Sequence, residues 1–326
     1  MNASESGREV RADRRRWDIV AFGEGLVEFN QDSATGLFRL GHGGDTSNCV
    51  IAAARLGARC AYITSIGDDE FGDELLALWK REGVGLDGVR RMPGEATGVY
   101  FVHHGAGGHR FTYRRAGSAA SKMTAEKVCA APLRETAWFH LSGISLAIGP
   151  GPALAAEAAS EIATRHGARV CFDLNYRPAL QTTTDALRAA RRLLVQGPLF
   201  LVSVDEAEQV LSLTSPRDIV KWGHDHGASS VVVKDGARGC VLSDGTGVSE
   251  CEGLGVQAVD ATGAGDCFAG ACLYRLAMGD DLPAAARFAN VAAALSTRGY
   301  GAVAPLPTAA AVEAALSAMG VRTGTP

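Results

Sequence analysis

The sequence predicts an α/β protein in which a mostly parallel sheet is covered by helices on both faces. Short runs rich in β-branched and aromatic residues recur along the chain, and longer segments of helical periodicity separate them. The 326 residues are 47% hydrophobic, which suffices to bury a large core in one large domain or two modest ones. In such folds, ligands gather at the carboxyl ends of the strands.

Six apolar runs are expected to form strands of this sheet: 17–22, 60–66, 137–143, 168–174, 198–203 and 229–235. Helical patterns fall between them at 46–56, 70–82, 150–166, 184–196 and 205–226. A further short apolar run, 255–259, leads through a glycine turn into a last helical pattern, in which Cys267, Phe268 and Ala271 share one face.

Two regions break this alternation. Residues 35–41, and the pair 96–104 and 109–114 joined by the turn Gly-Ala-Gly-Gly, alternate like antiparallel strands. Because no helix separates them, we expect a small second sheet that acts as a lid, formed by residues 30–42 and 92–116.

Charge and cysteine content limit the functional classes. A net charge of −4 provides no broad attraction to nucleic acid or to a membrane. The eight cysteines form no C-x-x-C pair, which indicates reduced, buried thiols of a cytoplasmic protein. Residues 1–16 are polar and basic without a signal-like apolar stretch, so we expect a disordered tail there, a domain at 17–320 and a second tail at 321–326.

Several short motifs lack the flanking elements that their usual functions require. Gly83, Gly85 and Gly88 fit G-x-G-x-x-G, but a helical pattern precedes them and none follows, which disfavours a nicotinamide-dependent dehydrogenase. The sequence contains no P-loop motif. The histidines in 103–104 and in 224–226 do not share a face of their expected elements, so neither pair indicates a metal site.

The stretch from Asp260 to Asp266, DATGAGD, carries the strongest indication of chemistry. Its glycines permit a tight turn, and the first N–H groups of the following helix lack an internal partner, so a phosphate is favoured there. A carboxylate at Asp266 would repel that phosphate unless the reaction needs a proton acceptor, as phosphoryl transfer to a hydroxyl does. The alternative is that Asp266 only caps the helix.

Two more segments accompany this motif. Gly43–Gly57, GGDTSNCVIAAARLG, is a second glycine turn that leads into a helix of small residues, and SIGDDEFG follows at Ser65–Gly72. Together the three resemble the PfkB, or ribokinase-like, family of carbohydrate kinases over residues 17–318. The resemblance implies a three-layer α/β/α sandwich with a β lid that closes over a sugar and often forms a dimer contact, and hence a homo-oligomer.

The resemblance also assigns roles near the DATGAGD turn. It implies that Asp266 is the base that takes the proton of the sugar hydroxyl as this attacks the γ-phosphate of ATP. It implies further that the backbone of Gly263, Ala264, Gly265 and Asp266 forms an anion hole for the transferred phosphoryl group. Asp260 matches a position that helps some relatives bind a monovalent cation such as K⁺, whereas a turn-stabilising Asp is the alternative.

For the nucleotide, the resemblance points to Lys234, Gly236 and Gly239, which would line its groove, and to Asn290, which would lie beside the adenine or else on a plain helix surface. The family's Asn-x-x-Glu motif reads Ser203 to Glu206, SVDE, here. The Glu is kept and the Asn is replaced. Mg²⁺ is still expected, because ATP brings it and Glu206 would reach it through water.

For the substrate, segments 23–30, 97–100, 111–121 and 172–180 look most like the 2-keto-3-deoxygluconate kinases of the family. A sugar carboxylate favours guanidinium donors, for which Arg115 and Arg177 are the candidates unless they form surface ion pairs. The other residues that we expect to contact the sugar are Gly43, Gly44, Asp45, Asn48, Tyr100 and Tyr113. The rivals are a fructokinase or ribokinase that acts on a neutral sugar, and a sugar sensor without catalysis.

Overall fold

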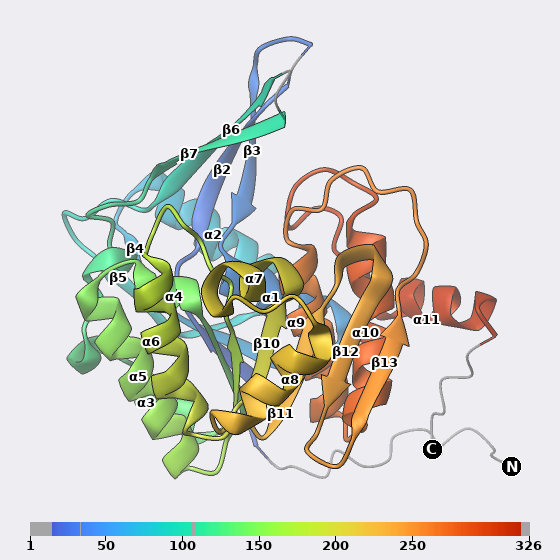
Figure 1. Cartoon of the computed structure of the whole chain (residues 1–326). Helices are drawn as coiled ribbons and strands as arrows, with labels where there is room; N and C mark the ends of the chain where they lie inside the picture. The colour runs from blue at the N-terminus through green and yellow to red at the C-terminus, as the bar shows by residue number, and fades with distance from the viewer. Residues whose placement is uncertain (1–14, 33, 106–107, 321–326) are drawn as a thin grey trace, which may run out of the picture.

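Two sheets form the frame of the protein, which the computed structural model describes over residues 15–32, 34–105 and 108–320 (Figure 1). The larger sheet has nine strands in the order β13-β12-β11-β10-β9-β8-β1-β4-β5, and all neighbours are parallel except β11–β12 and β12–β13. Its strands are β1 (Trp17–Phe22), β4 (Cys60–Gly67), β5 (Gly85–Met92), β8 (Thr136–Ser142), β9 (Arg169–Asp173), β10 (Leu199–Ser203), β11 (Ser230–Lys234), β12 (Gly239–Ser243) and β13 (Val248–Glu252).

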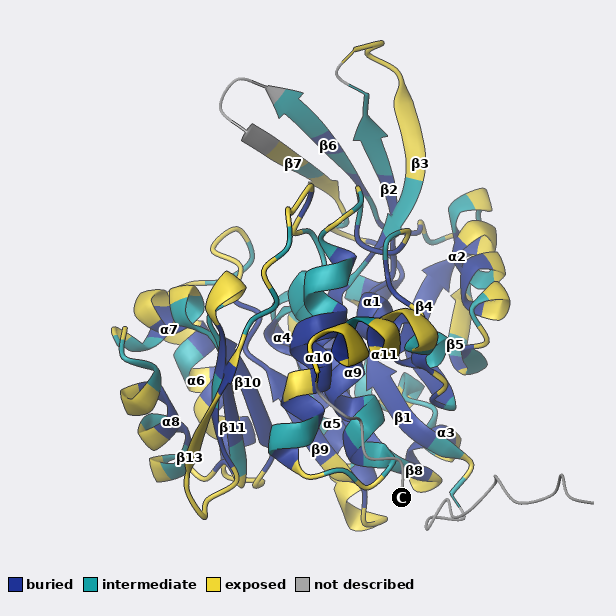
Figure 2. Ribbon diagram, turned by 90° about the vertical axis from the view of Figure 1, so that its right-hand side faces the viewer, coloured by how far each residue is buried: buried dark blue, intermediate teal, exposed yellow. Residues whose placement is uncertain are grey.

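Helices cover both faces of this sheet, and its central strands are buried between them, whereas the edge strands β5 and β13 are partly exposed (Figure 2). The helices are α1 (Asp45–Leu56), α2 (Glu70–Arg81), α3 (Ala130–Arg134), α4 (Gly143–Ala147), α5 (Pro150–Arg165), α6 (Thr183–Leu194), α7 (Val204–Leu211), α8 (Pro216–Asp225), α9 (Ala264–Ala277), α10 (Leu282–Ser296) and α11 (Ala309–Ala318). Alternate residues of β1 point into two cores: Ile19 joins the one under α1, α2, α9, α10 and α11, and Val20 joins the one under α3 to α8. This three-layer arrangement confirms the predicted fold class.

The prediction of one helix was wrong. Residues 205–226 form two helices, because Ser212 takes the left-handed conformation at φ 57° and Ser215 and Pro216 begin a new helix, α8. The apolar run 255–259 before the glycine turn is irregular, and this edge of the sheet is formed by β12 and β13. The glycine motif at 83–88 leads into β5, where Gly85 packs against the ring of Trp17.

The lid is the separate four-stranded sheet that stands above the body in Figure 1, as predicted. Its strands are β2 (Leu26–Gln31), β3 (Phe38–Gly43), β6 (Val99–Gly105) and β7 (Gly108–Arg114), in the order β3-β2-β6-β7. Strand β2, which pairs antiparallel with β3 and parallel with β6, was not predicted. Glu28, Tyr100 and Tyr113 lie opposite one another in register and share one face of the lid.

Two further expectations concern the chain as a whole. The eight cysteines all lie in the described part of the chain, carry free thiols and, except for Cys129, are buried. In the described residues, no helix has the length and apolarity needed to cross a membrane. The predicted tails fall on residues 1–14 and 321–326, outside the described part, but Arg15 and Arg16 are described and contact the body through Gly167 and Asp87.

Helix α9 packs closely on α1 at Gly270. A methyl group at this position would lie 2.3 Å from the carbonyl oxygen of Cys49 and 3.0 Å from Cβ of Ala52. We therefore expect Gly270→Ala to lower the free energy of unfolding by about 1–3 kcal/mol, although alanine is the better helix former. Urea denaturation measures this, and Gly247→Ala, whose methyl group meets no atom within 4 Å, is the control. Equal stability of both variants would contradict the close contact.

Candidate active site

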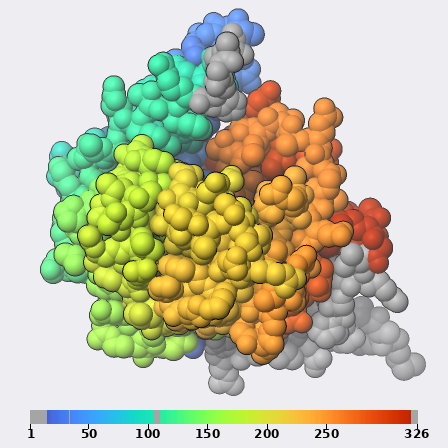
Figure 3. Space-filling view, in the orientation of Figure 1, coloured from blue at the N-terminus to red at the C-terminus, as the bar shows by residue number. Residues whose placement is uncertain are grey.

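A cavity of about 1080 Å³ opens between the lid and the carboxyl ends of the central strands. In Figure 3 the surface is hollowed where the blue-green lid, the yellow middle of the chain and the orange C-terminal third meet. Fourteen of the residues predicted for the site line it: Gly44, Asp45, Asn48, Tyr100, Tyr113, Arg115, Arg177, Ser203, Glu206, Lys234, Gly236, Gly263, Gly265 and Asp266. Segments that lie more than 200 residues apart in sequence thus meet at one site.

Gly43 and Gly44 connect lid strand β3 to helix α1 and allow close packing of the chain at the bottom of the cavity. Gly44 has φ 107°, and a methyl group there would lie 2.2 Å from the carbonyl oxygen of Glu24. A methyl group at Gly43, the last residue of β3, would lie 2.4 Å from the hydroxyl oxygen of Tyr100, so Gly43 packs against this lid residue although it does not line the cavity. Only glycine fits both positions, and helix α1 starts next at Asp45.

Asp266 lies in the first turn of α9 and is joined to α1. Its Oδ2 accepts a hydrogen bond of 2.8 Å from Nδ2 of Asn48. Burial raises the pKa of Asp266 to about 7, and the nearby carboxylate of Asp45 adds to this, whereas the hydrogen bond from Asn48 opposes it. A carboxyl group with this pKa exchanges protons near neutral pH, as a general base requires.

The turn before α9 has the geometry of an anion site. Gly263 has φ 75° and precedes the helix, whose first N–H groups lack a partner within the helix, and Gly263, Gly265 and Asp266 line the cavity. The N–H of Ala264 donates to the carbonyl of Ala261 at 3.1 Å, which leaves Gly265 and Asp266 as the better placed donors of the predicted anion hole. Ala264 itself does not line the cavity.

Asp260 stabilises this turn. Its Oδ1 accepts hydrogen bonds from the backbone N–H of Thr262 at 2.9 Å and from the Thr262 hydroxyl at 2.6 Å. Its Oδ2 accepts from the N–H of Gly301 at 2.9 Å. These bonds form an Asx turn, the alternative role that the sequence left open for Asp260.

Arg115 is paired with a carboxylate that sequence reasoning missed. Its Nη2 lies 2.5 Å from Oε2 of Glu24, and the Glu24 side chain is only 1% exposed. Oε1 of Glu24 accepts a hydrogen bond of 2.8 Å from Ser118. Burial raises the pKa of Glu24, against the opposing charge of Arg115. Glu24 lay in a segment that resembles sugar acid kinases, but no local pattern marked it, because its partner lies in a distant loop.

Arg177 is more accessible than Arg115. Its side chain is 49% exposed, and Nη1 lies 3.7 Å from Oε1 of Glu206. Glu206 and Ser203 form a capping box at the start of α7, in which Oε2 of Glu206 accepts a hydrogen bond of 2.8 Å from the Ser203 N–H. In this chain, Ser203 and Glu206 therefore stabilise the first turn of α7.

Lys234 forms a buried ion pair beneath the cavity. Its Nζ lies 2.6 Å from Oδ2 of Asp173, and the two side chains are 14% and 3% exposed. Burial alone would lower the pKa of Lys234, but the carboxylates of Asp173 and Glu206 raise it. Asp173, at the end of β9, was not predicted as part of the site.

Another missed residue is Asn175, which lines the cavity two positions beyond Asp173. It takes a left-handed conformation at φ 36°, and its Nδ2 donates a hydrogen bond of 3.0 Å to Oδ2 of Asp45. The sequence does not show this backbone conformation, so Asn175 could be assigned to the site only from the structure.

Two predicted nucleotide contacts lie apart from the cavity lining. The side chain of Asn290 is buried, and its Nδ2 donates to the carbonyl oxygens of Cys251 at 3.2 Å and of Glu252 at 3.4 Å. Gly239, at the start of β12, packs against the same carbonyl of Cys251. Both residues therefore hold β12 and β13 in place behind the turn at Gly236–Arg238, which contributes lining residues.

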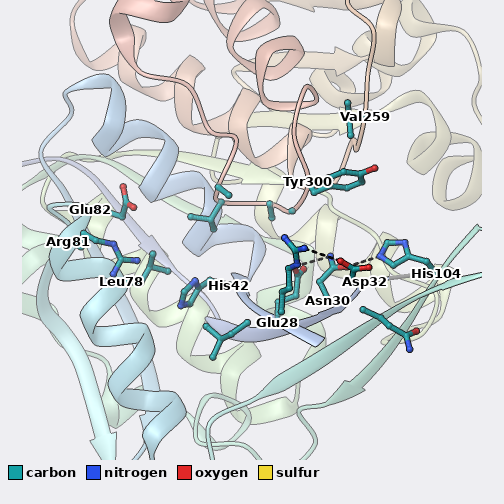
Figure 4. A pocket seen from close by; sticks show the side chains of 18 of the residues that line it. Glu28, Asn30, Asp32, His42, Leu78, Arg81, Glu82, His104, Val259 and Tyr300 are labelled. Atoms are coloured by element: carbon teal, nitrogen blue, oxygen red, sulfur yellow. Dashed lines mark hydrogen bonds and ion pairs between the residues drawn. The ribbon is translucent and has the colours of Figure 1, made fainter. Parts of the chain in front are cut away.

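A second cavity of about 810 Å³ lies between the lid and the segment around Tyr300 (Figure 4). A row of hydrogen bonds crosses its wall. His104 Nε2 and Asn30 Oδ1 are 2.7 Å apart, Asn30 Nδ2 donates to Glu28 at 3.2 Å, and Glu28 accepts from the hydroxyl of Tyr100. Because Tyr100 lines the larger cavity, this row links the two cavities across the lid.

Comparison with known proteins agrees with this architecture. Residues 17–309 match the model of the pfkB family of carbohydrate kinases. The chain is 30% identical over 303 residues to the 2-dehydro-3-deoxygluconokinase of Dickeya dadantii (strain 3937), which covers 89% of this chain and 97% of the relative. It is 33% identical over 312 residues to fructokinase-1 of Zea mays, with coverages of 90% and 96%.

Among solved structures, a putative ribokinase II from E. coli in complex with ATP and Mg²⁺ superposes with a TM-score of 0.85 at 26% identity. The match covers 93% of this chain and 99% of that one. The fold and the family match therefore agree along nearly the whole length of the chain. This chain belongs to the pfkB family of carbohydrate kinases.

Proposed function

We propose that the protein transfers the γ-phosphate of ATP to the 6-hydroxyl of 2-keto-3-deoxygluconate. The observation that carries the proposal is the position of Asp266, a carboxylate of raised pKa at the start of α9, in a cavity that also contains Arg177 and Arg115. A base beside an anion site suits phosphoryl transfer to a hydroxyl, and guanidinium groups suit an acidic sugar. The likeness to a 2-dehydro-3-deoxygluconokinase supports this substrate.

In this proposal each group has one task. Asp266 takes the proton of the attacking hydroxyl, and Asn48 holds its carboxylate in place. The N–H groups at the start of α9 bind the transferred phosphoryl oxygens, where charge accumulates in the transition state. The lid excludes water, so that attack by the sugar hydroxyl outcompetes hydrolysis.

The nucleotide would lie along Lys234 and the turn at Gly236–Arg238. Magnesium would enter with the phosphates; Asp205, Glu206 and Asp235 are the lining carboxylates on this side of the cavity, and the family resemblance assigns the ion to Glu206. No group of three or more metal-ligating side chains occurs among the described residues, which suits an ion that the nucleotide brings. A K⁺ ion near Asp260 remains part of the proposal through the family resemblance alone.

A fructokinase is the second candidate, and one contact favours it. Because Glu24 already balances the charge of Arg115, Arg177 is the one of the two predicted arginines whose guanidinium group is half-exposed and accessible to a substrate carboxylate. A neutral sugar would bring no further charge to the ion pair of Arg115 and Glu24. The 33% identity to a fructokinase points the same way.

Substrate choice is tested with purified protein, ATP, Mg²⁺ and a panel of sugars. We expect kcat/KM for 2-keto-3-deoxygluconate to exceed that for fructose and ribose. Arg177→Gln should lower kcat/KM for the sugar acid. The activation free energy should rise by about 1.5–3 kcal/mol, the value of a hydrogen bond to a charged group, while any reaction with fructose stays nearly unchanged. Arg188→Gln, which removes an exposed arginine on α6, is the matched control. Preference of the wild-type protein for fructose would overturn the substrate assignment.

We further infer that the lid pairs with a second copy of the chain. The free thiols support a cytoplasmic location for this assembly. The face of the lid opposite Tyr100 carries a cluster of aromatic rings, Phe29, Phe38 and Phe101. Next to it, Leu37 and Leu40 are 69% and 50% exposed. Apolar side chains gathered on one exposed face support a protein contact there.

A further inference from the structure

We propose that Cys240 and Cys251 form a modification site, a thiol pair that a small disulfide oxidises reversibly to an intramolecular disulfide. We further propose that this oxidation weakens binding of the nucleotide. The second part rests on the proposed ATP site, whereas the first stands on the geometry of the two strands.

The register of the two edge strands sets the distance between the thiols. Cys240 of β12 and Cys251 of β13 are directly opposite in an antiparallel pair. Opposite residues in such a pair have Cα atoms about 4.5 or 5.5 Å apart, and both values lie within the range that a disulfide spans. Both side chains point into the same core beneath α10, and their thiols are hydrogen-bonded to each other.

The surroundings make the two sulfur atoms chemically unequal. The hydrogen bond from Cys240 and the guanidinium group of Arg287 lower the pKa of Cys251 to about 7, against the effect of burial. The pKa of Cys240 is raised by the same hydrogen bond and by burial. Burial also raises the pKa of Cys49, Cys171 and other core thiols. Cys251 is therefore the thiolate that attacks, and Cys240 is the thiol that resolves.

The reaction balances with one molecule of a low-molecular-weight disulfide. The thiolate of Cys251 attacks one of its sulfur atoms, forms a mixed disulfide and releases one thiolate. Cys240 then loses its proton, attacks the sulfur of Cys251 and releases the second thiolate. Two cysteine thiols are oxidised and one small disulfide is reduced to two thiols. β13 is the last strand of the sheet (Figure 1), so local opening of this edge exposes the sulfur atoms without unfolding the core.

The thiol pair is in contact with the proposed nucleotide turn. Gly239 has φ 102°, and a methyl group there would lie 2.1 Å from the carbonyl oxygen of Cys251. Asn290 donates to the same carbonyl and, at 3.6 Å, to Sγ of Cys240. A disulfide that draws Cys251 toward Cys240 therefore shifts Gly239 and the adjoining turn, from which Ala237 and Arg238 line the cavity.

The experiment equilibrates the full chain in buffers of reduced and oxidised glutathione. We expect an intact mass two hydrogens lower and a peptide that links Cys240 to Cys251, both reversed by dithiothreitol. Calorimetry should show weaker ATP binding for the oxidised form. Cys240→Ser and Cys251→Ala should each abolish the link and the change in ATP affinity, whereas Cys129→Ser, which removes the one cysteine that is not buried, should preserve both.

Either part can fail separately. Recovery of no Cys240–Cys251 peptide at any glutathione ratio, or of mixed disulfides alone, would overturn the modification site. A disulfide that forms without changing the affinity for ATP would overturn its coupling to the nucleotide. If the protein binds no ATP in either form, the proposed function fails, but peptide mapping still decides whether the thiol pair reacts.

Discussion

Asp266→Asn is expected to lower kcat by about 10²- to 10⁴-fold, because it removes the only proton acceptor proposed for the sugar hydroxyl. The amide keeps the size of the carboxylate and its place beside Asn48, so ATP affinity should stay close to that of the wild-type protein. A coupled assay for ADP gives kcat, and calorimetry gives the affinity. Asp280→Asn, which breaks the ion pair with Arg275 beyond the other end of α9, is the matched control. Near-normal turnover of Asp266→Asn would remove it from the base role.

The same residue should set the pH dependence of the reaction. The base must be ionised, and burial raises the pKa of Asp266 to about 7. We therefore expect kcat to fall as the pH drops through about 7 and to be constant above it. The hydrogen bond from Asn48 lowers this pKa, so Asn48→Ala should move the midpoint to higher pH, which a merely structural role of Asn48 would not do. A flat profile between pH 5 and 8 would contradict the assignment.

Stability should respond in the opposite sense. The folded protein holds the proton of Asp266 up to about pH 7, whereas the unfolded chain releases it near the ordinary value of 3.8. Between these values the folded state binds more protons, so the contribution of Asp266 to stability falls as the pH rises. Asp266→Asn should therefore stabilise the protein more at pH 8 than at pH 4, as urea unfolding would measure. An equal effect at both pH values would mean that the pKa is not raised.

How much the sequence could predict depends on how local each signal is. The glycines and carboxylates of DATGAGD and of the segment from Gly43 stand next to the turns that they form, and the structure brings Asn48 and Asp266 together as neighbours. Strand β2 was not predicted, because a six-residue run alone reveals neither its antiparallel pairing with β3 nor its parallel pairing with β6, about 70 residues away. The division of 205–226 depends on one left-handed residue, Ser212, which has no strong sequence signature.

The partners of charged residues were the hardest part to predict. Arg115 was expected to bind substrate, but the structure pairs it with Glu24, at 2.5 Å, from the end of another strand. Lys234 was expected to line the nucleotide groove, but it also forms an ion pair with Asp173. A sequence shows the sign of a charge and not the distance to its counter-ion. Neither pair could have been found without the fold.

Lys234→Met is expected to have the largest effect on stability. It leaves the carboxylate of Asp173 buried without its cation, a change that costs about 3–5 kcal/mol in other proteins. Asp173→Asn should be destabilising for the converse reason. The double variant removes both charges, so its loss should be clearly smaller than the sum of the two single losses. Urea denaturation of the four proteins measures this coupling.

The same four proteins separate the two roles of Lys234. If Lys234 also contacts the nucleotide, its loss must weaken ATP binding in the double variant even where stability has returned. If the ion pair is its only task, the double variant regains both stability and ATP affinity, and the predicted nucleotide contact is wrong. Lys221→Met, which breaks the exposed ion pair with Asp225 on α8, should change neither quantity by more than about 0.5 kcal/mol. The comparison thus distinguishes a lysine that only holds the end of β11 from one that also binds phosphate.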